Sequence, residues 1–169
     1  RVLTARFSDA KYFYETDRKK KLADRFDGLK GVVYLEGLGS LHDRARRIHD
    51  LMIFLPPRIG IEVDLERYSD AAYLSKADLL TEVVREFPEL QGVMGRIYAK
   101  LEGLPDEMAD AIAEHYQPRG PQDPLPPSPL GALLALADKF ELVLGAYSLG
   151  LRPSASADPY GLRRAAIGI

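Results

Sequence analysis

Three histidines and two aspartates are the side chains of this sequence best suited to chemistry. His42 and His49 are seven residues apart in one helical pattern, so they share a helix face, and His115 is close to the end of another pattern. Asp78 and Asp138 stand inside apolar segments, where a carboxylate must find a partner or change its pKa. Imidazole and carboxylate groups that converge from separate elements can hold a divalent metal.

The same residues also fit purely structural roles. Asp78 and Asp138 can serve as buried hydrogen-bond acceptors that fix helix packing, with Asp138 paired to a lysine or an arginine. His42 and His49 fit exposed positions on a helix, beside arginines. His115 fits the favourable interaction between a histidine and the C-terminal end of a helix dipole. These residues alone leave both interpretations open.

Helices must position these side chains, because apolar residues recur with helical spacing through most of the chain. Ser40 is a favourable N-cap, and Pro56-Pro57 ends the helix that follows it. Residues 32–35 favour a strand but are too few to establish one. Residues 117–129, rich in proline, are expected to form a loop within one domain. The sequence predicts an all-α fold, with helices over residues 3–18, 22–29, 41–55, 65–83, 88–101, 105–116 and 130–149 and a last one beginning at Asp158-Pro159.

Composition excludes several classes of function. The chain has no cysteine, so disulfides, thiolate zinc sites and cysteine nucleophiles are ruled out. Its net charge is -2, from 23 basic and 25 acidic side chains, so nothing global indicates a nucleic acid or a membrane partner. No apolar run is long enough to cross a bilayer, and no signal peptide opens the chain. We therefore expect a cytoplasmic protein.

The order His42, Asp78, His115, Asp138 in an all-α chain resembles the HD superfamily of metal-dependent phosphohydrolases. In that superfamily a His, a tandem His-Asp and a distal Asp hold metals that activate water against a phosphate ester. The resemblance implies an HD-domain-like helical bundle. Here Lys76-Ala77-Asp78 occupies the place of the tandem His-Asp, which removes one ligand and adds an ammonium that opposes a divalent cation. We therefore expect degenerate positions without a metal, and an active HD-type phosphohydrolase using these four residues is the alternative.

Four stretches carry a second and more specific resemblance. They are residues 75–95, 114–119, 136–139 and 158–166. Together with matches nearer the N-terminus, they resemble the beta subunit of the bacterial heterotetrameric glycyl-tRNA synthetase along nearly the whole chain. Because the chain begins with Arg rather than Met and ends within an apparent amphipathic helix, we expect a piece of a longer, multidomain chain.

This resemblance implies a helical module that supports tRNA(Gly) binding and synthetase architecture for ATP-dependent glycylation. It implies an α2β2 heterotetramer with the synthetase alpha subunit, which would supply the ATP and Mg chemistry, so no catalytic or cofactor-binding residue is expected in this segment. The whole of residues 1–169 would be one HD-like domain. Within it, 1–39 would be the leading helices, 40–149 the HD-like core and 150–169 the start of the following helical region. No membrane partner is expected.

Basic side chains are the candidates for RNA contact, because a rigid helical face can present them to phosphates and 2′-hydroxyls. Arg163 and Arg164 are the preferred candidates, followed by Lys76, Arg96 and Arg119. The alternative for the arginine pair is an intramolecular salt bridge to a helix or to a neighbouring domain, since Arg also pairs well with carboxylates. A third reading of the chain is a purely structural interaction module.

Overall fold

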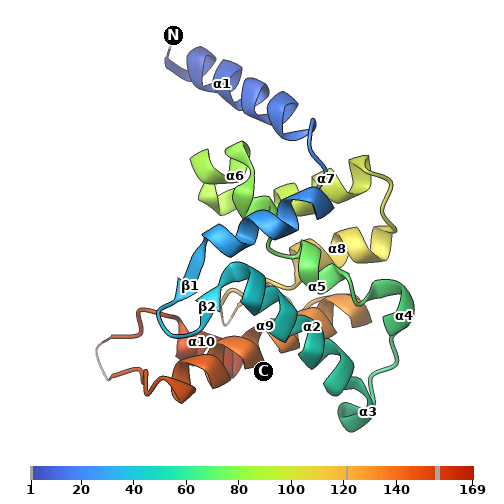
Figure 1. The fold of residues 1–169 in the computed structure, drawn as a ribbon, viewed down its shortest axis with the longest axis vertical. Helices are drawn as coiled ribbons and strands as arrows, with labels where there is room; N and C mark the ends of the chain where they lie inside the picture. Colours follow the sequence, from blue (N-terminus) through green and yellow to red (C-terminus); the bar gives the residue numbers. More distant parts are fainter. Residues whose placement is uncertain (1, 121, 155–156) are drawn as a thin grey trace.

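The chain is built almost entirely of helices, as the sequence predicts (Figure 1). The computed structural model describes residues 2–120, 122–154 and 157–169. Its one sheet in these ranges is a two-stranded antiparallel hairpin that pairs Val33 with Ser40 and Leu35 with Gly39. The α-helices (α), 3₁₀-helices (η) and strands (β) are α1 Val2–Asp17, η1 Ala23–Gly31, β1 Val33–Leu35, β2 Gly39–Ser40, α2 Leu41–Phe54, α3 Pro56–Ile59, α4 Leu65–Tyr68, α5 Ala71–Leu74, η2 Ala77–Leu80, α6 Glu82–Glu86, η3 Pro88–Leu90, α7 Val93–Leu101, α8 Asp106–Glu114, α9 Pro129–Ser148 and α10 Leu162–Ile167.

Helix α2 forms where its sequence predicts it. The Ser40 side chain accepts a hydrogen bond from the backbone N–H of Asp43, and the Asp43 carboxylate accepts one from the backbone N–H of Ser40. This reciprocal capping box satisfies two N–H groups that have no partner inside the helix. The apolar stripe of α2 faces the core and is buried at Leu41, Ala45, Ile48 and Met52. The helix ends at Phe54, and the two prolines then open the short α3.

The predicted continuous helix over residues 65–83 is wrong, because the structure divides that segment into α4, α5, η2 and the start of α6. Side-chain hydroxyls compete there for backbone partners. The Ser75 hydroxyl donates to the carbonyl of Ala72, and the Thr81 hydroxyl donates to the carbonyl of Asp78. Thr81 has an extended backbone and caps α6 by accepting from the N–H of Val84. These breaks place Lys76 between α5 and η2, outside any regular helix.

The helix predicted to begin at Pro88 begins later. A short η3 comes first, and α7 starts at Val93 after Gly92, whose φ is +80°. The final helix also starts late, at Leu162 rather than at Asp158. The Asp158 carboxylate still caps it, accepting from the backbone N–H groups of Leu162 and Arg163 at 2.8 and 2.9 Å. Asp158 therefore marks the approach to α10 without being part of it.

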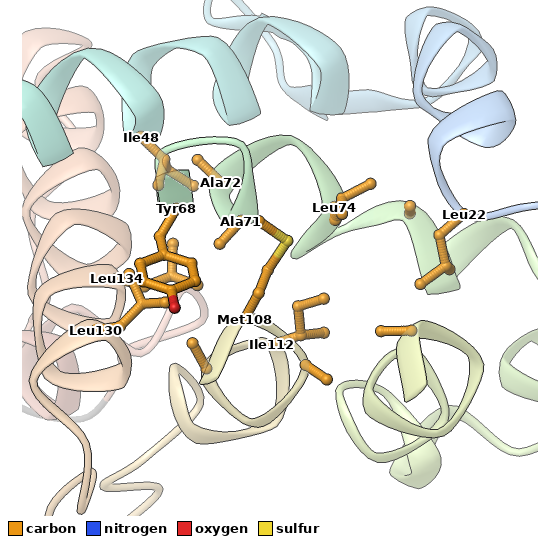
Figure 2. Close-up of a cluster of buried hydrophobic side chains, with 14 of the residues drawn as sticks. Leu22, Ile48, Tyr68, Ala71, Ala72, Leu74, Met108, Ile112, Leu130 and Leu134 are labelled. Atoms are coloured by element: carbon orange, nitrogen blue, oxygen red, sulfur yellow. The ribbon is translucent and has the colours of Figure 1, made fainter. Parts of the chain in front are cut away.

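The hydrophobic core lies among α2, α5, α8 and α9, with α7 packed on α8. Figure 2 shows Ile48 from α2, Ala71 and Ala72 from α5, and Met108 from α8 converging on one cluster. Small alanines on α5 let the neighbouring helices approach closely, which is how a dense core is filled without voids. Within the described ranges, no helix has the length and apolarity needed to cross a membrane.

Helix α1 projects from this body and is fastened at its C-terminal end (Figure 1). The Asp17 carboxylate accepts hydrogen bonds from the backbone N–H groups of Glu82 and Val83, at 2.8 and 3.0 Å, and from the hydroxyl of Tyr98 at 3.0 Å. Asp17 therefore caps α6 from a distant part of the chain and ties α1, α6 and α7 together. The HD-like arrangement of the helices and the boundaries at residues 39/40 and 149/150 stay predictions.

Candidate functional site

A buried network of charges joins α2 to α9. Arg44 lies with Nη2 3.0 Å from the Asp138 carboxylate and Nε 3.1 Å from the Glu141 carboxylate. Arg47 reaches Glu141 at 2.7 Å. Lys76, from the break after α5, places Nζ 2.9 Å from Asp138. The sequence predicts a Lys or Arg partner for Asp138, and this is confirmed twice over, although neither Arg44 nor Glu141 was identified in advance.

Lys76 also joins the network to the end of α8. Its Nζ is 2.8 Å from His115 Nε2, while His115 Nδ1 is 2.7 Å from the carbonyl oxygen of Ile112. A carbonyl can only accept, so Nδ1 carries the proton and Nε2 accepts from the ammonium. Burial and then the charge of Lys76 hold the pKa of His115 well below its ordinary value. His115 thus meets the C-terminal end of α8 as the sequence predicts, but as a buried, neutral imidazole that donates its Nδ1–H to the carbonyl of Ile112.

Asp138 and Lys76 remain charged at neutral pH. Burial opposes ionisation of Asp138, but Arg44 and then Lys76 outweigh it and hold the pKa of this carboxyl well below its usual range. Burial lowers the pKa of Lys76 to about 8, against the attraction of Asp138. The carboxylate is thus shared by two cations that have little access to water.

Asp78 has a separate, structural role. Its Oδ2 accepts hydrogen bonds from the backbone N–H groups of Gly92 and Gly95 at 2.6 and 3.1 Å. Burial raises the pKa of this carboxyl in spite of those two donors. The contacts fix η2 against the first turn of α7, which confirms the predicted role of a buried acceptor.

The two histidines of α2 lie away from this network. The rings of His42 and Phe26 have centroids 4.3 Å apart, and His49 stacks on Tyr73 at 4.6 Å. Their side chains are only 12% and 17% exposed, so the prediction of exposed positions is wrong. Apolar packing on η1 and α5, invisible in a single helical pattern, explains the difference.

Of the four HD-like positions, the structure therefore brings His115 and Asp138 together and places Lys76 between them. The Asp78 carboxylate accepts a hydrogen bond from the backbone N–H of Gly92, and His42 packs on Phe26. Over the described residues, no three His, Asp or Glu side chains gather in a way that could hold a metal ion. An ammonium in the space between two candidate ligands opposes a divalent cation by direct repulsion.

A pocket of about 310 Å³ opens beside His115 and Asp138. Its charged lining consists of Arg119, Lys139 and Arg164 and one carboxylate, Asp138. Lys139 is buried, and its Nζ donates to the carbonyl oxygen of Gln117 at 2.6 Å. Three cations against one carboxylate give this lining a net charge of +2 with a neutral histidine. The remaining lining residues are Gln91, His115, Tyr116, Pro118, Leu142, Tyr160, Gly161 and Ala165.

The residues predicted to contact RNA are placed very differently from one another. Lys76 is 2% exposed and held by Asp138 and His115, so the structure does not offer it to RNA, and that prediction is wrong for this side chain. Arg96 is half-exposed but pairs with Asp110 at 2.8 Å.

Arg119, Arg163 and Arg164 are all exposed. The guanidinium of Arg163 lies against the carbonyl oxygen of Ser154, and Arg119 and Arg164 line the same pocket. Among the residues that the structure describes, none of these three guanidiniums is ion-paired with a carboxylate. A salt bridge from Arg163 or Arg164 to another helix is therefore not seen in these ranges, and a salt bridge to a neighbouring domain stays a prediction.

Comparisons with known proteins agree over the full chain. The family model described as glycyl-tRNA synthetase beta subunit matches residues 1–169. The glycine–tRNA ligase beta subunits of Chromohalobacter salexigens and Neisseria gonorrhoeae are each 48% identical over 169 residues, and that of Phenylobacterium zucineum is 46% identical over 170. Each alignment covers 100% of this chain, which spans about a quarter of the length of these relatives. The chain belongs to the glycyl-tRNA synthetase beta subunit family.

Proposed function

We propose that this chain is a non-catalytic helical module of a glycine–tRNA ligase, supporting tRNA(Gly) binding and the architecture needed for ATP-dependent glycylation. Its relatives are named glycine–tRNA ligase beta subunits. The partners in this proposal are tRNA(Gly) and an alpha subunit in a cytoplasmic α2β2 heterotetramer. The alpha subunit would supply the ATP and Mg chemistry. The module would be a single HD-like domain with its core in residues 40–149.

The position of Lys76 is the observation that carries the non-catalytic part of the proposal. Its ammonium lies 2.9 Å from Asp138 and 2.8 Å from His115, where a metal-dependent phosphohydrolase would need a divalent cation. The lysine neutralises Asp138 as a metal would, but it cannot polarise water or a phosphate ester as a Lewis acid. In this proposal, a side chain of the protein supplies the positive charge that a metal would otherwise supply.

Guanidiniums that form no ion pair with a carboxylate in the described ranges support the RNA-binding part. Arg119, Arg163 and Arg164 are exposed and carry no ion pair within the ranges described, so a phosphate can bind them without first displacing a carboxylate. Phosphate contacts of this kind provide affinity and orientation rather than sequence recognition. We therefore assign this surface a role in docking the RNA, with recognition of tRNA(Gly) left to the assembled synthetase.

The test uses the full-length beta chain assembled with its alpha subunit. Replacing both Arg163 and Arg164 by glutamine should weaken tRNA(Gly) binding and reduce the steepness of its salt dependence, since each lost phosphate contact lowers that slope by about one. Arg85→Gln is the matched control, since Arg85 is an exposed arginine on α6 whose ion pair in the described part of the chain is with Glu82. Unchanged affinity and salt slope in the double variant would leave a purely structural module as the better reading.

A second measurement addresses the phosphohydrolase alternative. The same assembly is titrated with manganese and assayed with phosphodiester and nucleotide substrates. We expect no turnover that depends on Asp138. Stoichiometric metal binding accompanied by hydrolysis, both lost in Asp138→Asn but retained in the Arg85 control, would refute the non-catalytic assignment.

A further inference from the structure

We propose that the pocket between α8, α9 and α10 binds the phosphate of a single nucleotide, with Arg119 and Arg164 as the phosphate-binding side chains. The nucleotide would be either a free mononucleotide or one residue of an RNA strand. This deepens the RNA-binding proposal by naming the group that two of its arginines receive, and in the RNA case it rests on that proposal. The free-nucleotide case stands independently.

The charge of the pocket favours an anion. Its only carboxylate, Asp138, is already bound by Arg44 at 3.0 Å and by Lys76 at 2.9 Å. The negative charge of Asp138 is therefore already compensated by buried cations, while Arg119 and Arg164 line the pocket as exposed side chains and Lys139 adds a buried positive charge. In a partly enclosed space such a field is stronger than on an open surface.

The two arginines are free to bind. Neither guanidinium forms an ion pair in the described part of the chain, and the nearest aromatic contact of Arg119 is its position over the Tyr116 ring at 5.5 Å. A guanidinium binds phosphate through two parallel N–H donors. Arg119 follows α8 and Arg164 belongs to α10, so they approach from separate elements, as a site that surrounds its ligand requires.

The remaining lining favours a nucleotide over a bare inorganic ion. Tyr116, Tyr160 and Leu142 give the pocket an apolar and aromatic wall, and Tyr160 is 42% exposed. Nucleobases stack on such rings without regard to sequence. The volume of about 310 Å³ lies at the small end of the range for small-molecule sites, which begins near 300 Å³. It suits one nucleotide rather than an extended strand.

Two substitutions test the site without disturbing the core, because both arginines are exposed. Binding of AMP, GMP, CMP and UMP to the full-length chain is measured by calorimetry beside the matching nucleosides. We expect each nucleotide to bind at least tenfold more tightly than its nucleoside, and the Arg119→Gln/Arg164→Gln variant to lose at least tenfold in nucleotide affinity, as charged hydrogen bonds imply. Arg85→Gln should bind as the unaltered chain does.

An RNA arm distinguishes the two sources of the phosphate. If free nucleotides do not bind, Arg119→Gln alone should still weaken tRNA(Gly) binding at least tenfold, and Arg85→Gln should not. If tRNA(Gly) does not bind at all, the RNA-docking function fails, and the nucleotide titration alone decides the pocket. The proposal is overturned if the Arg119→Gln/Arg164→Gln variant binds both nucleotides and tRNA(Gly) as the unaltered chain does. In that outcome the RNA-docking function can still hold, because RNA binding would then depend on other residues.

Discussion

The buried network predicts an asymmetry between its anion and its cations. Among the residues that the structure describes, Asp138 is the only carboxylate that forms an ion pair with Lys76, and it also contacts Arg44. Replacing Asp138 by asparagine therefore leaves two buried cations facing each other, whereas replacing Lys76 by methionine leaves Asp138 with one partner. We expect Asp138→Asn to be the far more damaging change.

The distances give the magnitude. At 2.9 and 3.0 Å, each cation attracts Asp138 by about 5 to 6 kcal/mol at an effective dielectric constant of about 20. Much of that attraction offsets the cost of burial, so we expect Asp138→Asn to lower the free energy of unfolding by about 3 to 5 kcal/mol.

Lys76→Met has compensating effects. The pKa of Lys76 falls from 10.5 to about 8, so the protonated side chain is about 3 kcal/mol less favoured in the folded chain than in the unfolded chain. A neutral side chain escapes that cost but leaves His115 Nε2 without its donor, a loss of about 1 to 3 kcal/mol. The two nearly cancel, and we expect a net change below about 2 kcal/mol.

Urea denaturation of both variants and of the double variant measures the asymmetry, with coincident fluorescence and circular dichroism transitions as the check on two-state behaviour. The double variant should be more stable than Asp138→Asn alone, because it removes Lys76, the cation left without a carboxylate, while Arg44 keeps Glu141. The reasoning is refuted if Lys76→Met destabilises the chain as much as Asp138→Asn does, or if the double variant shows the sum of the two losses.

The pH dependence provides an independent readout. Between about pH 8 and 10.5 the unfolded chain keeps the Lys76 proton while the folded chain releases it, so the free energy of unfolding should rise with pH, by up to about 1.4 kcal/mol per pH unit. Lys139, whose pKa burial also lowers, acts in the same direction. Above about pH 10 the raised pKa values of Tyr98 and Tyr116 oppose the rise, so measurements belong between pH 7 and 9.5. In Lys76→Met the rise should be largely lost.

Three further predictions concern His115, Gly92 and Asp17. The neutral, buried His115 should make the chain lose stability as the pH falls below about 6.5, by up to about 1.4 kcal/mol per pH unit, and urea midpoints for His115→Gln should show a flatter profile from pH 7 to 5. Gly92→Ala, at φ +80° with a tyrosine ring carbon 2.6 Å from the added Cβ, should cost about 2 to 5 kcal/mol, while Gly60→Ala, at φ +71° in open space, should cost only about 1 to 2 kcal/mol; equal midpoint shifts would contradict the steric argument. Asp17→Ala should lower the free energy of unfolding by about 2 to 4 kcal/mol through the loss of three hydrogen bonds, whereas the exposed Asp27→Ala should change it by less than about 0.5 kcal/mol.

Local signals were sufficient for the regular helices. The N-cap at Ser40, the proline pair after Phe54 and the apolar spacing of α2 and α9 act within a few residues, and those helices formed close to the predicted bounds. The segment of residues 65–83 was mispredicted because its apolar spacing is helical while its hydroxyls bond elsewhere. The Thr81 hydroxyl bonds to the carbonyl of Asp78, and a periodicity argument does not see that competition.

The sequence predicted that Asp138 has a basic partner in the charge network but did not identify that partner. An aspartate in an apolar helix indicates that a partner exists, but its identity depends on which helices pack together. Arg44 and Asp138 are far apart in the sequence, and they meet because α2 packs on α9. A spacing signal did exist, since Asp138 and Glu141 are three residues apart on one helix face, as are Arg44 and Arg47. Two matched pairs of opposite charge on two amphipathic helices indicate helices that face each other.

Lys76 owes its position to the helix break that the periodicity did not predict. In a continuous helix, the position of residue 76 around the helix would fix the direction of its side chain. Lys76 is instead the N-cap residue of η2, where its carbonyl accepts a hydrogen bond from the N–H of Leu79, and its side chain extends to Asp138 and His115. A substitution that supplied a metal ligand at this position would therefore have to replace the ammonium charge and keep the break in the helix. We expect Lys76→His to leave both Asp138 and His115 poorly paired unless zinc or manganese is added, so rescue of its stability by metal would show that the break alone preserves the geometry of a metal centre.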